Sequence, residues 1–401
     1  RGFDRFFGTI HGAGSFWDPN SLTLDNTQIA PADVSDDFYY TEQKCDYAEK
    51  FIREHVEKRP DDPFFVYLPF TAPHWPMHAR ERDIEKYEGR YAKGWDTLRA
   101  ERHERMKEMG LVSEDWPLSP RDKRAKSWED TGDLQPWYER RMEVYAAMLD
   151  NMDQGIGKLV GALKELDRFD NTLILFIADN GGCAEENGSR GEADQKEQLG
   201  AMDPKELQFD MVPKKTRDGW KVRRGVGVMP GPPDTYVAYG LEWANASNTP
   251  FREYKHWVHE GGIATPLIAH WPSGISRKGD LEPTPGHLID IMATCVELSG
   301  AEYPETFHDG TKIQPMEGRS LVPAFAGKGD TIEREALYWE HEGNRAVRVG
   351  DWKLVAKGRN GPWELYDLAK DRTELNDLAA KMPEKVEKLS ALWQAYAERT
   401  N

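Results

Sequence analysis

Three short segments of the sequence hold the side chains best suited to chemistry, and the first is the tetrapeptide DNGG that begins at Asp179. The carboxylate of Asp179 and the side-chain carbonyl of Asn180 are hard oxygen ligands, which suit Ca²⁺, or less well Mg²⁺, better than Zn²⁺. The two glycines that follow allow the backbone to turn sharply and to approach a ligand closely. The alternative interpretation is a turn without a metal, because Asn-Gly is a common turn dipeptide.

The other two segments carry His74, in the loop TAPHWP, and Lys255, in YKHWVHEGG. A histidine held in a proline-flanked loop could donate a proton to a leaving oxygen. A lysine could pair with an oxyanion and stabilise charge that grows in a transition state. The alternatives are a structural histidine and an ordinary solvated lysine.

The residues after Lys255 include the pattern H-x-x-H-E, formed by His256, His259 and Glu260. This pattern invites comparison with zinc motifs, but it matches neither H-E-x-x-H nor H-x-x-E-H. The following pair Gly261-Gly262 breaks the helix that such motifs require. We therefore do not expect this pattern to form a zinc site.

The elements that must position these residues alternate between helix and strand. Apolar side chains at helical spacing predict amphipathic helices, and continuous apolar runs predict buried strands. The helices are expected at about 41–58, 137–166 and 287–299, and the strands at 64–68, 172–177 and 266–270. This alternation predicts an α/β fold, with a mostly parallel sheet and helices on both faces. In such sheets, ligands bind beyond the carboxyl ends of the strands, where DNGG and His74 are expected.

Two long stretches do not follow this pattern, and the pattern itself changes near the end of the chain. Residues 79–136 are polar and indicate a surface insertion with some helix, whereas 184–250 indicate a long irregular loop. After a linker at 326–335, short strands predict a small antiparallel sheet, followed by a helix. These elements are expected at 336–339, 346–349, 352–356, 363–366 and 383–398. We therefore predict a catalytic domain over 1–335 and a C-terminal α+β subdomain over 336–401.

Composition narrows the class of protein. The chain has 401 residues, of which 38% are apolar and 31% are charged, and this argues for a globular fold with a sizeable core. The net charge of −17 argues against nucleic acid as a partner, because phosphates need cationic side chains. No apolar run approaches the length of a membrane span. The three cysteines form no C-x-x-C pair.

Five blocks of the sequence resemble, in order, the corresponding blocks of arylsulfatase-type sulfatases. They are Gly2–Gly8, Phe64–Pro76, Asn151–Gly182, Trp243–Pro272 and Gly350–Leu378. The resemblance implies an alkaline-phosphatase-like fold with a small C-terminal antiparallel sheet and helix. It also implies hydrolysis of sulfate monoesters, of small molecules or carbohydrates, by a formylglycine nucleophile with Ca²⁺. Members of this family are often exported to the periplasm or beyond, so the resemblance implies such a location.

The same resemblance implies roles for individual residues. Asp179 and Asn180 match the pair that ligates Ca²⁺, and Asp179 is also expected to help deprotonate the nucleophile. His74 matches the histidine that contacts the sulfate and assists the leaving oxygen. Lys255 matches the sulfate-binding lysine.

One departure concerns the nucleophile, which sulfatases make from the Cys or Ser of a C/S-x-P-x-R motif. Cys45, Cys183 and Cys295 lie in CDYAE, CAEEN and CVELS, so none has this context. The sequence opens at Arg1, inside a patterned segment, and we interpret it as N-terminally truncated, with the nucleophile upstream. The chain by itself is therefore expected to be inactive.

Two other functions stay open. The first is a phosphatase or phosphonate hydrolase of the same superfamily, although such enzymes often carry an Asp-His pair where this chain has Asp179-Asn180. The second is a non-catalytic relative that binds sulfated glycans.

Overall fold

The computed structural model describes residues 2–400, which form two compact units. One unit is built from residues up to 102, together with 121–169 and 183–247. The other contains 103–120, 170–182 and the chain from 248 onward. This division differs from the predicted domains in its boundaries, and the boundary at 335/336 stays a prediction.

The first unit is mainly helical, with one small antiparallel sheet in the order β1-β2-β3. Its strands are β1 (Phe7–Thr9), β2 (Leu22–Leu24) and β3 (Thr27–Gln28). Its helices are α1 (Tyr40–Lys58), α2 (Glu81–Ile84), α4 (Gln135–Glu165) and α5 (Gly240–Ser247), and α3 (Gly94–Glu108) begins in this unit. Short 3-10 turns lie at Pro31–Asp33, Glu85–Tyr87 and Glu129–Leu134, and another at Phe169–Asn171 begins in this unit.

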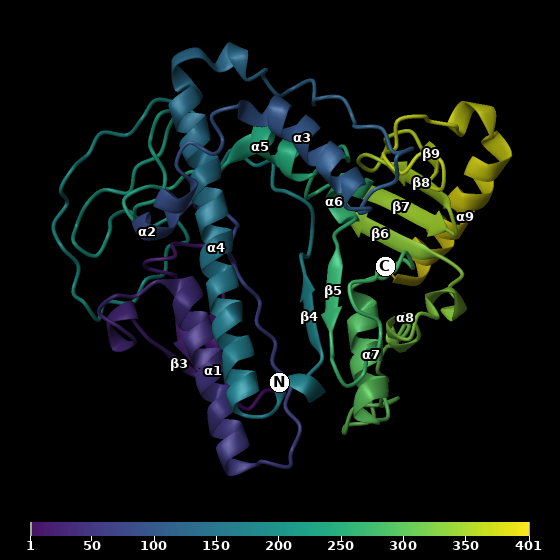
Figure 1. Cartoon of the computed structure of the whole chain (residues 1–401), viewed down its shortest axis with the longest axis horizontal. Coiled ribbons are helices and arrows are strands. Elements are labelled where there is room, and N and C mark those ends of the chain that lie inside the picture. Colours follow the sequence, from purple (N-terminus) through teal and green to yellow (C-terminus); the bar gives the residue numbers. More distant parts are fainter. Residues whose placement is uncertain (1, 401) are drawn as a thin grey trace. The chain divides into compact units, whose positions relative to one another are not determined.

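Helices α1 and α4 pack against each other and are the two longest elements of this unit (Figure 1). Both were predicted from the 3.6-residue spacing of their apolar side chains. The predicted faces are buried, as shown by Ala48 and Ile52 on α1 and by Val144 and Met148 on α4. The prediction of these two helices is confirmed to within about two residues at each end.

The segment 79–136 contributes more to the core than its polar composition predicts. The indole of Trp95 is buried and makes edge-to-face contacts with Trp128, Tyr138 and Trp243, at centroid distances of 4.8, 5.2 and 5.3 Å. A few large aromatic rings therefore anchor a segment that is otherwise charged. The expectation of a surface insertion is wrong for the segment around Trp95 and Trp128. The average polarity of a segment does not reveal that a few of its large side chains are buried.

The second unit contains a two-stranded pair, a four-stranded sheet and several helices. The pair consists of β4 (Ile174–Ile177) and β5 (Leu267–His270). The sheet has the order β6 (Leu337–His341), β7 (Asn344–Val349), β8 (Trp352–Ala356) and β9 (Glu364–Asp367), antiparallel throughout. The helices are α6 (Glu260–Ile263), α7 (Ile289–Ser299), α8 (Val322–Phe325) and α9 (Pro383–Thr400), with 3-10 turns at Gly329–Thr331 and Ala379–Lys381.

Both faces of the four-stranded sheet are covered. Val347 and Leu354 point to one face and pack with Leu389 of α9. Ala346 and Val355 point to the other face and pack with Val258, which lies three residues after Lys255. Successive side chains of a strand alternate between faces, so one sheet supports both α9 and the segment that carries Lys255.

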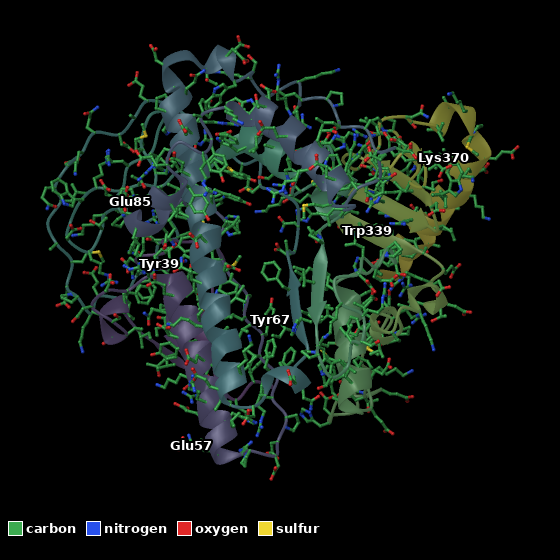
Figure 2. All side chains as sticks on the ribbon, viewed as in Figure 1. Tyr39, Glu57, Tyr67, Glu85, Trp339 and Lys370 are labelled. Carbon is green, nitrogen blue, oxygen red and sulfur yellow. The ribbon has the colours of Figure 1, made fainter. Side chains whose placement is uncertain are left out.

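The strand predicted at 64–68 is not formed. Phe65, Val66 and Tyr67 are 62%, 42% and 69% exposed, and the last is labelled in Figure 2. A strand needs a partner for its backbone hydrogen bonds, and within residues 2–400 no strand pairs with this segment. The prediction of a buried strand at 64–68 is therefore wrong for the described residues, because an apolar run forms a strand only where a partner pairs with its backbone.

Strands β4 and β5 were predicted, and both form, but they pair antiparallel. Every ladder between named strands of residues 2–400 is antiparallel, so the mostly parallel sheet predicted from the sequence is not observed there. A short apolar run indicates that a strand is buried, but it does not indicate the direction of the neighbouring strand. Across residues 2–400 we find no helix that is both long enough and apolar enough to traverse a bilayer.

Candidate functional site

The DNGG segment and the loop that carries Lys255 are joined by backbone hydrogen bonds. The N–H of Gly181 donates to the carbonyl of Gly262 at 3.0 Å, and the N–H of Lys255 donates to the carbonyl of Gly182 at 3.0 Å. The side-chain oxygen of Asn248 accepts the N–H of Gly182 at 2.7 Å. Residues that are 73 positions apart in the sequence therefore lie on adjoining loops of one unit.

Glycine is required where these loops meet. A Cβ atom at Gly181 would lie 1.8 Å from the carbonyl oxygen of Gly261. The side-chain amide of Asn248 donates to that same oxygen at 2.8 Å and to the carbonyl of Glu253 at 2.7 Å. The close approach of the two backbones thus depends on the absence of a side chain at position 181.

One residue separates Asp179 and Asn180 from the end of β4, and Asp179 is exposed. Their carboxylate and amide oxygens fit a hard cation such as Ca²⁺, and the glycine-lined turn leaves the backbone close to them. Because Ca²⁺ takes six to eight oxygens, these two residues would supply only part of a coordination shell.

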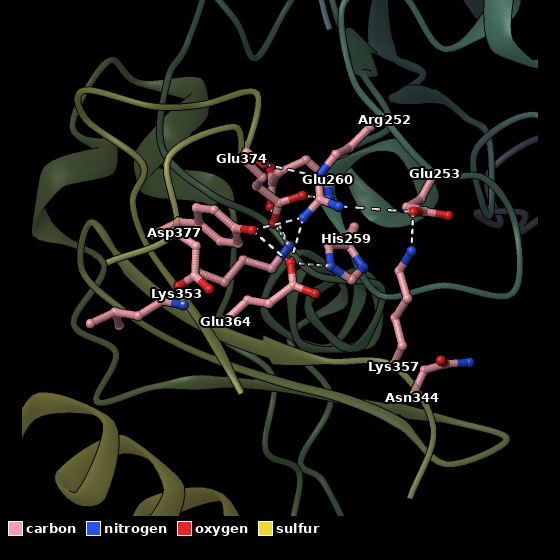
Figure 3. A network of polar contacts seen from close by, with 12 residues as sticks. Arg252, Glu253, His259, Glu260, Asn344, Lys353, Lys357, Glu364, Glu374 and Asp377 are labelled. Atoms are coloured by element: carbon pink, nitrogen blue, oxygen red, sulfur yellow. Dashed lines mark hydrogen bonds and ion pairs between the residues drawn. The ribbon is translucent and has the colours of Figure 1, made fainter. Parts of the chain in front are cut away.

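The segment before Lys255 is anchored by Arg252 (Figure 3). One guanidinium nitrogen lies 2.6 Å from the carboxylate of Glu364 and 2.8 Å from the hydroxyl of Tyr366, both on β9. Another donates to the backbone carbonyl of Glu374 at 2.8 Å. Charge-assisted hydrogen bonds of this kind fix a side chain more firmly than neutral ones.

The segment after Lys255 is anchored by Glu260, which is buried. Its carboxylate accepts from Lys353 of β8 at 2.7 Å and pairs with Arg372. Its backbone N–H donates to the carboxylate of Glu374 at 2.8 Å (Figure 3). Both ends of the Lys255 loop are therefore tied to the C-terminal sheet and the turn that follows it.

His259 is fully buried in the same network, with Nε2 3.4 Å from the carboxylate of Glu364. Burial by itself would raise the pKa of Glu364, but the hydrogen bond from His259 and the positive charges of His259 and Arg252 hold that pKa well below its usual range. His259 and Glu260 therefore act as anchors of the loop.

His74 lies in the first unit, in the predicted loop. Its Nδ1 is 2.9 Å from the carbonyl oxygen of Trp75. A carbonyl can only accept, so Nδ1 carries the hydrogen and the lone pair of the neutral ring is on Nε2. Ligand-type atoms of His74, Cys183 and Glu185 all lie within 4.8 Å of one another, and Glu185 also accepts from the indole of Trp75 at 2.6 Å.

The structure thus places Asp179, Asn180 and Lys255 on adjoining loops of one unit and places His74 in the other. Sequence patterns did not identify Asn248, which has no periodic or motif context. Cys183 and Glu185 were also missed as neighbours of His74, although Cys183 directly follows DNGG in the sequence.

The fold is shared with solved structures. The chain superposes on Ps i-CgsB with a TM-score of 0.61 and 20% identity, covering 98% of this chain and 66% of the other. It superposes on BT4656, solved with its substrate D-glucosamine-2-N,6-O-disulfate, with a TM-score of 0.58 and 18% identity, covering 99% and 76%. These similarities define an α/β protein of the alkaline-phosphatase-like class, which confirms the predicted fold class.

Sequence comparison defines the family. Residues 1–301 match the family described as Sulfatase, and 253–398 match the one described as N-sulphoglucosamine sulphohydrolase, C-terminal. An uncharacterized sulfatase of Schizosaccharomyces pombe is 30% identical over all of this chain and 71% of its own length. The arylsulfatase of Klebsiella aerogenes is 30% identical over 80% of this chain and 65% of its own length. The chain belongs to the sulfatase family, and it spans about two thirds of the length of these relatives.

Proposed function

We propose that the protein hydrolyses sulfate monoesters, and that this chain supplies the metal-binding and sulfate-binding side chains of the reaction. The observation that carries the proposal is the hydrogen-bonded junction of the DNGG segment with the Lys255 loop in a member of the sulfatase family. The junction places a hard-oxygen pair and a lysine on adjoining loops, and a cation and an ammonium group there would suit the negatively charged oxygens of a sulfuryl group.

Each side chain has one proposed task. Asp179 and Asn180 would hold Ca²⁺, and the carboxylate of Asp179 would also accept a proton from the nucleophile. Lys255 would bind a sulfuryl oxygen and stabilise the charge that develops on it. When bound, Ca²⁺ supplies a fixed positive charge to the sulfate oxygens.

His74 would donate a proton to the departing alcohol or phenol oxygen. The contact of Nδ1 with the carbonyl of Trp75 supports this task, because it leaves Nε2 as the nitrogen that gains and loses the proton. The imidazole needs no change of tautomer between turnovers.

The nucleophile is proposed to be a formylglycine that these residues do not include. Cys183 lies near His74 but lacks the C/S-x-P-x-R context, so it is not the proposed precursor. We propose that the 401-residue chain alone does not hydrolyse sulfate esters, and that activity requires a further segment with this motif.

The substrate class is proposed from relatives only. BT4656 was solved with a sulfated glucosamine, and the Klebsiella aerogenes relative is an arylsulfatase. A sulfated sugar is our proposal for the natural substrate, with an aryl sulfate as a convenient assay compound.

The test compares an aryl sulfate with the matching aryl phosphate, using the full-length protein that contains this chain and, separately, the printed chain. We expect the full-length protein to hydrolyse the sulfate in preference to the phosphate, and elemental analysis to find one bound Ca²⁺ per chain. We expect the 401-residue chain alone to be inactive. Preference for the phosphate together with two bound metals would favour a phosphatase. A full-length protein that binds sulfated glycans without turnover would favour the non-catalytic alternative.

A further inference from the structure

A second group of metal-ligand side chains joins His256, the residue after Lys255, to the exposed turn between β6 and β7. Nδ1 of His256 is 3.0 Å from the carboxylate of Glu342, and the rings of His256 and His341 are 5.5 Å apart in an edge-to-face arrangement. One ligand atom from each of the three residues lies within 4.8 Å of the others. All three side chains belong to the second unit.

These residues come from two segments that a single buried side chain holds together. The amide nitrogen of Asn344 donates to the carbonyl of His256 and to the carbonyl of His341, both at 3.0 Å. The amide oxygen of Asn344 accepts the N–H of Gly358 at 3.0 Å. Asn344 is only 4% exposed, so the backbones that carry the two imidazoles are fixed relative to each other.

The hairpin itself orients Glu342. His341 is the last residue of β6 and pairs with Asn344, so Glu342 and Gly343 form a two-residue turn with φ of 51° and 84°. Positive φ at both central residues is the geometry of a type I′ turn, which matches the twist of the strands. The carboxylate is thus presented on the same turn as the second imidazole.

We propose that His256, His341 and Glu342 form a binding site for Zn²⁺ or a similar transition-metal ion. Two imidazole nitrogens and one carboxylate oxygen are the ligand set of three-ligand zinc sites, which leave a fourth position for water or another group. Imidazole ligands disfavour Ca²⁺, which binds oxygen almost exclusively, so this site and the proposed Ca²⁺ site select different ions. The ligand set is also different from the H-x-x-H-E pattern, because His259 and Glu260 are committed to the buried network.

The imidazoles must be neutral to coordinate, so the affinity for Zn²⁺ falls in acid. The three side chains are exposed, and their ligand atoms already lie within 4.8 Å of one another.

The experiment titrates the purified, chelator-treated chain with Zn²⁺ by calorimetry, in excess Ca²⁺ and in a Cys183→Ser background. That background removes the thiol of the group around His74, which could otherwise bind zinc as well. We expect one Zn²⁺ site, and we expect His341→Ala or Glu342→Gln to weaken it by at least about 100-fold, beyond the loss typical of an outer-shell substitution. His308→Ala, which removes another exposed histidine of the same unit, should leave the affinity unchanged.

Co²⁺ provides a second readout, because its visible absorption reports nitrogen and oxygen ligands in a tetrahedral site. We expect this absorption in the Cys183→Ser chain and its loss in His341→Ala, with circular dichroism showing that the variant is folded. Folded protein that binds no Zn²⁺, or a Zn²⁺ affinity that His341→Ala does not change, would overturn the proposal. None of these readouts depends on sulfate hydrolysis, so they fail or succeed independently of the proposed function.

Discussion

The backbone N–H of Lys255 donates a 3.0 Å hydrogen bond to the carbonyl oxygen of Gly182. This bond ties the proposed sulfate-binding lysine to the segment that carries the proposed metal ligands Asp179 and Asn180. The backbone of residue 255 is therefore fixed relative to the backbone of the DNGG segment. Changes in that backbone should affect the site even where no functional side chain is altered.

Gly181→Ala should disrupt this junction, because the added Cβ would lie 1.8 Å from the carbonyl of Gly261. Backbone cannot yield as a flexible side chain does, so we expect a loss of stability of about 1–3 kcal/mol by urea unfolding. Gly286→Ala is the matched control in the same unit, since its Cβ would meet only Leu321, at 3.7 Å. Equal stability of the two variants would show that the close approach at Gly181 is not required.

Lys353→Met should weaken the anchoring of the Lys255 loop. Lys353 is fully buried between Glu260 and Glu374, at 2.7 and 2.9 Å, and its removal leaves two buried carboxylates without their shared cation. Breaking a buried ion pair in this way typically costs about 3–5 kcal/mol, which urea unfolding would measure.

The control for that substitution is Lys370→Met, at the exposed Lys370 labelled in Figure 2. Lys370 pairs with Asp367 at 2.9 Å but is 83% exposed, so its loss should change stability by less than about 1 kcal/mol. A small effect of Lys353→Met, similar to that of the control, would contradict the structural role of the network.

His78 should make stability depend on pH. It is buried, with Nε2 2.7 Å from the carbonyl of Thr235 and Nδ1 accepting the N–H of Phe16 at 3.3 Å. Burial lowers the pKa of His78 to about 4, although the hydrogen bond to Thr235 opposes this shift. In the unfolded chain the pKa is about 6.5, so the unfolded state binds more protons between these values.

The stability contributed by neutral His78 is therefore complete above about pH 6.5 and is lost as the pH falls toward 4, by about 3 kcal/mol. His78→Gln retains a donor and an acceptor but does not titrate. We expect the difference in unfolding free energy between the native chain and this variant to shift by that amount between pH 7 and pH 4. A difference that is constant over this range would show that His78 is not buried in its neutral form.

Lys255→Met should reduce kcat of the full-length protein by about 10²-fold, the scale expected when one partner of a developing oxyanion is removed. Lys278→Met, at an exposed lysine of the same unit, should leave kcat unchanged. A Lys255→Met enzyme with the native rate would remove this residue from the mechanism.

Local patterns were sufficient to predict several of the longer helices and the strands of the second unit. Apolar spacing identified α1, α4 and α7, and apolar runs identified β4, β5 and the strands of the C-terminal sheet. They failed where the outcome depends on a partner that is distant in the sequence. The run at 64–68 has the composition of a strand but no partner among residues 2–400, and Trp95 is a core residue because three other rings surround it.

The candidate site, too, could be predicted only in part from local patterns. Asp179, Asn180 and Lys255 are recognisable from short motifs, and their loops adjoin in the structure. The groups that hold those loops, such as Asn248 and Arg252, act through contacts with carbonyls and carboxylates that lie up to 122 positions away. No local pattern encodes such contacts, so only the fold reveals them.

The most direct test of the proposed metal site is the hydrolysis of an aryl sulfate by the full-length protein and its Asp179→Ala variant, with Ca²⁺ bound per chain measured in parallel. We expect the variant to lose both the bound Ca²⁺ and nearly all turnover, and we expect chelation of the native enzyme to have the same effect. Native turnover in a variant that has lost the carboxylate would contradict the assignment of this segment as the metal site of a sulfatase.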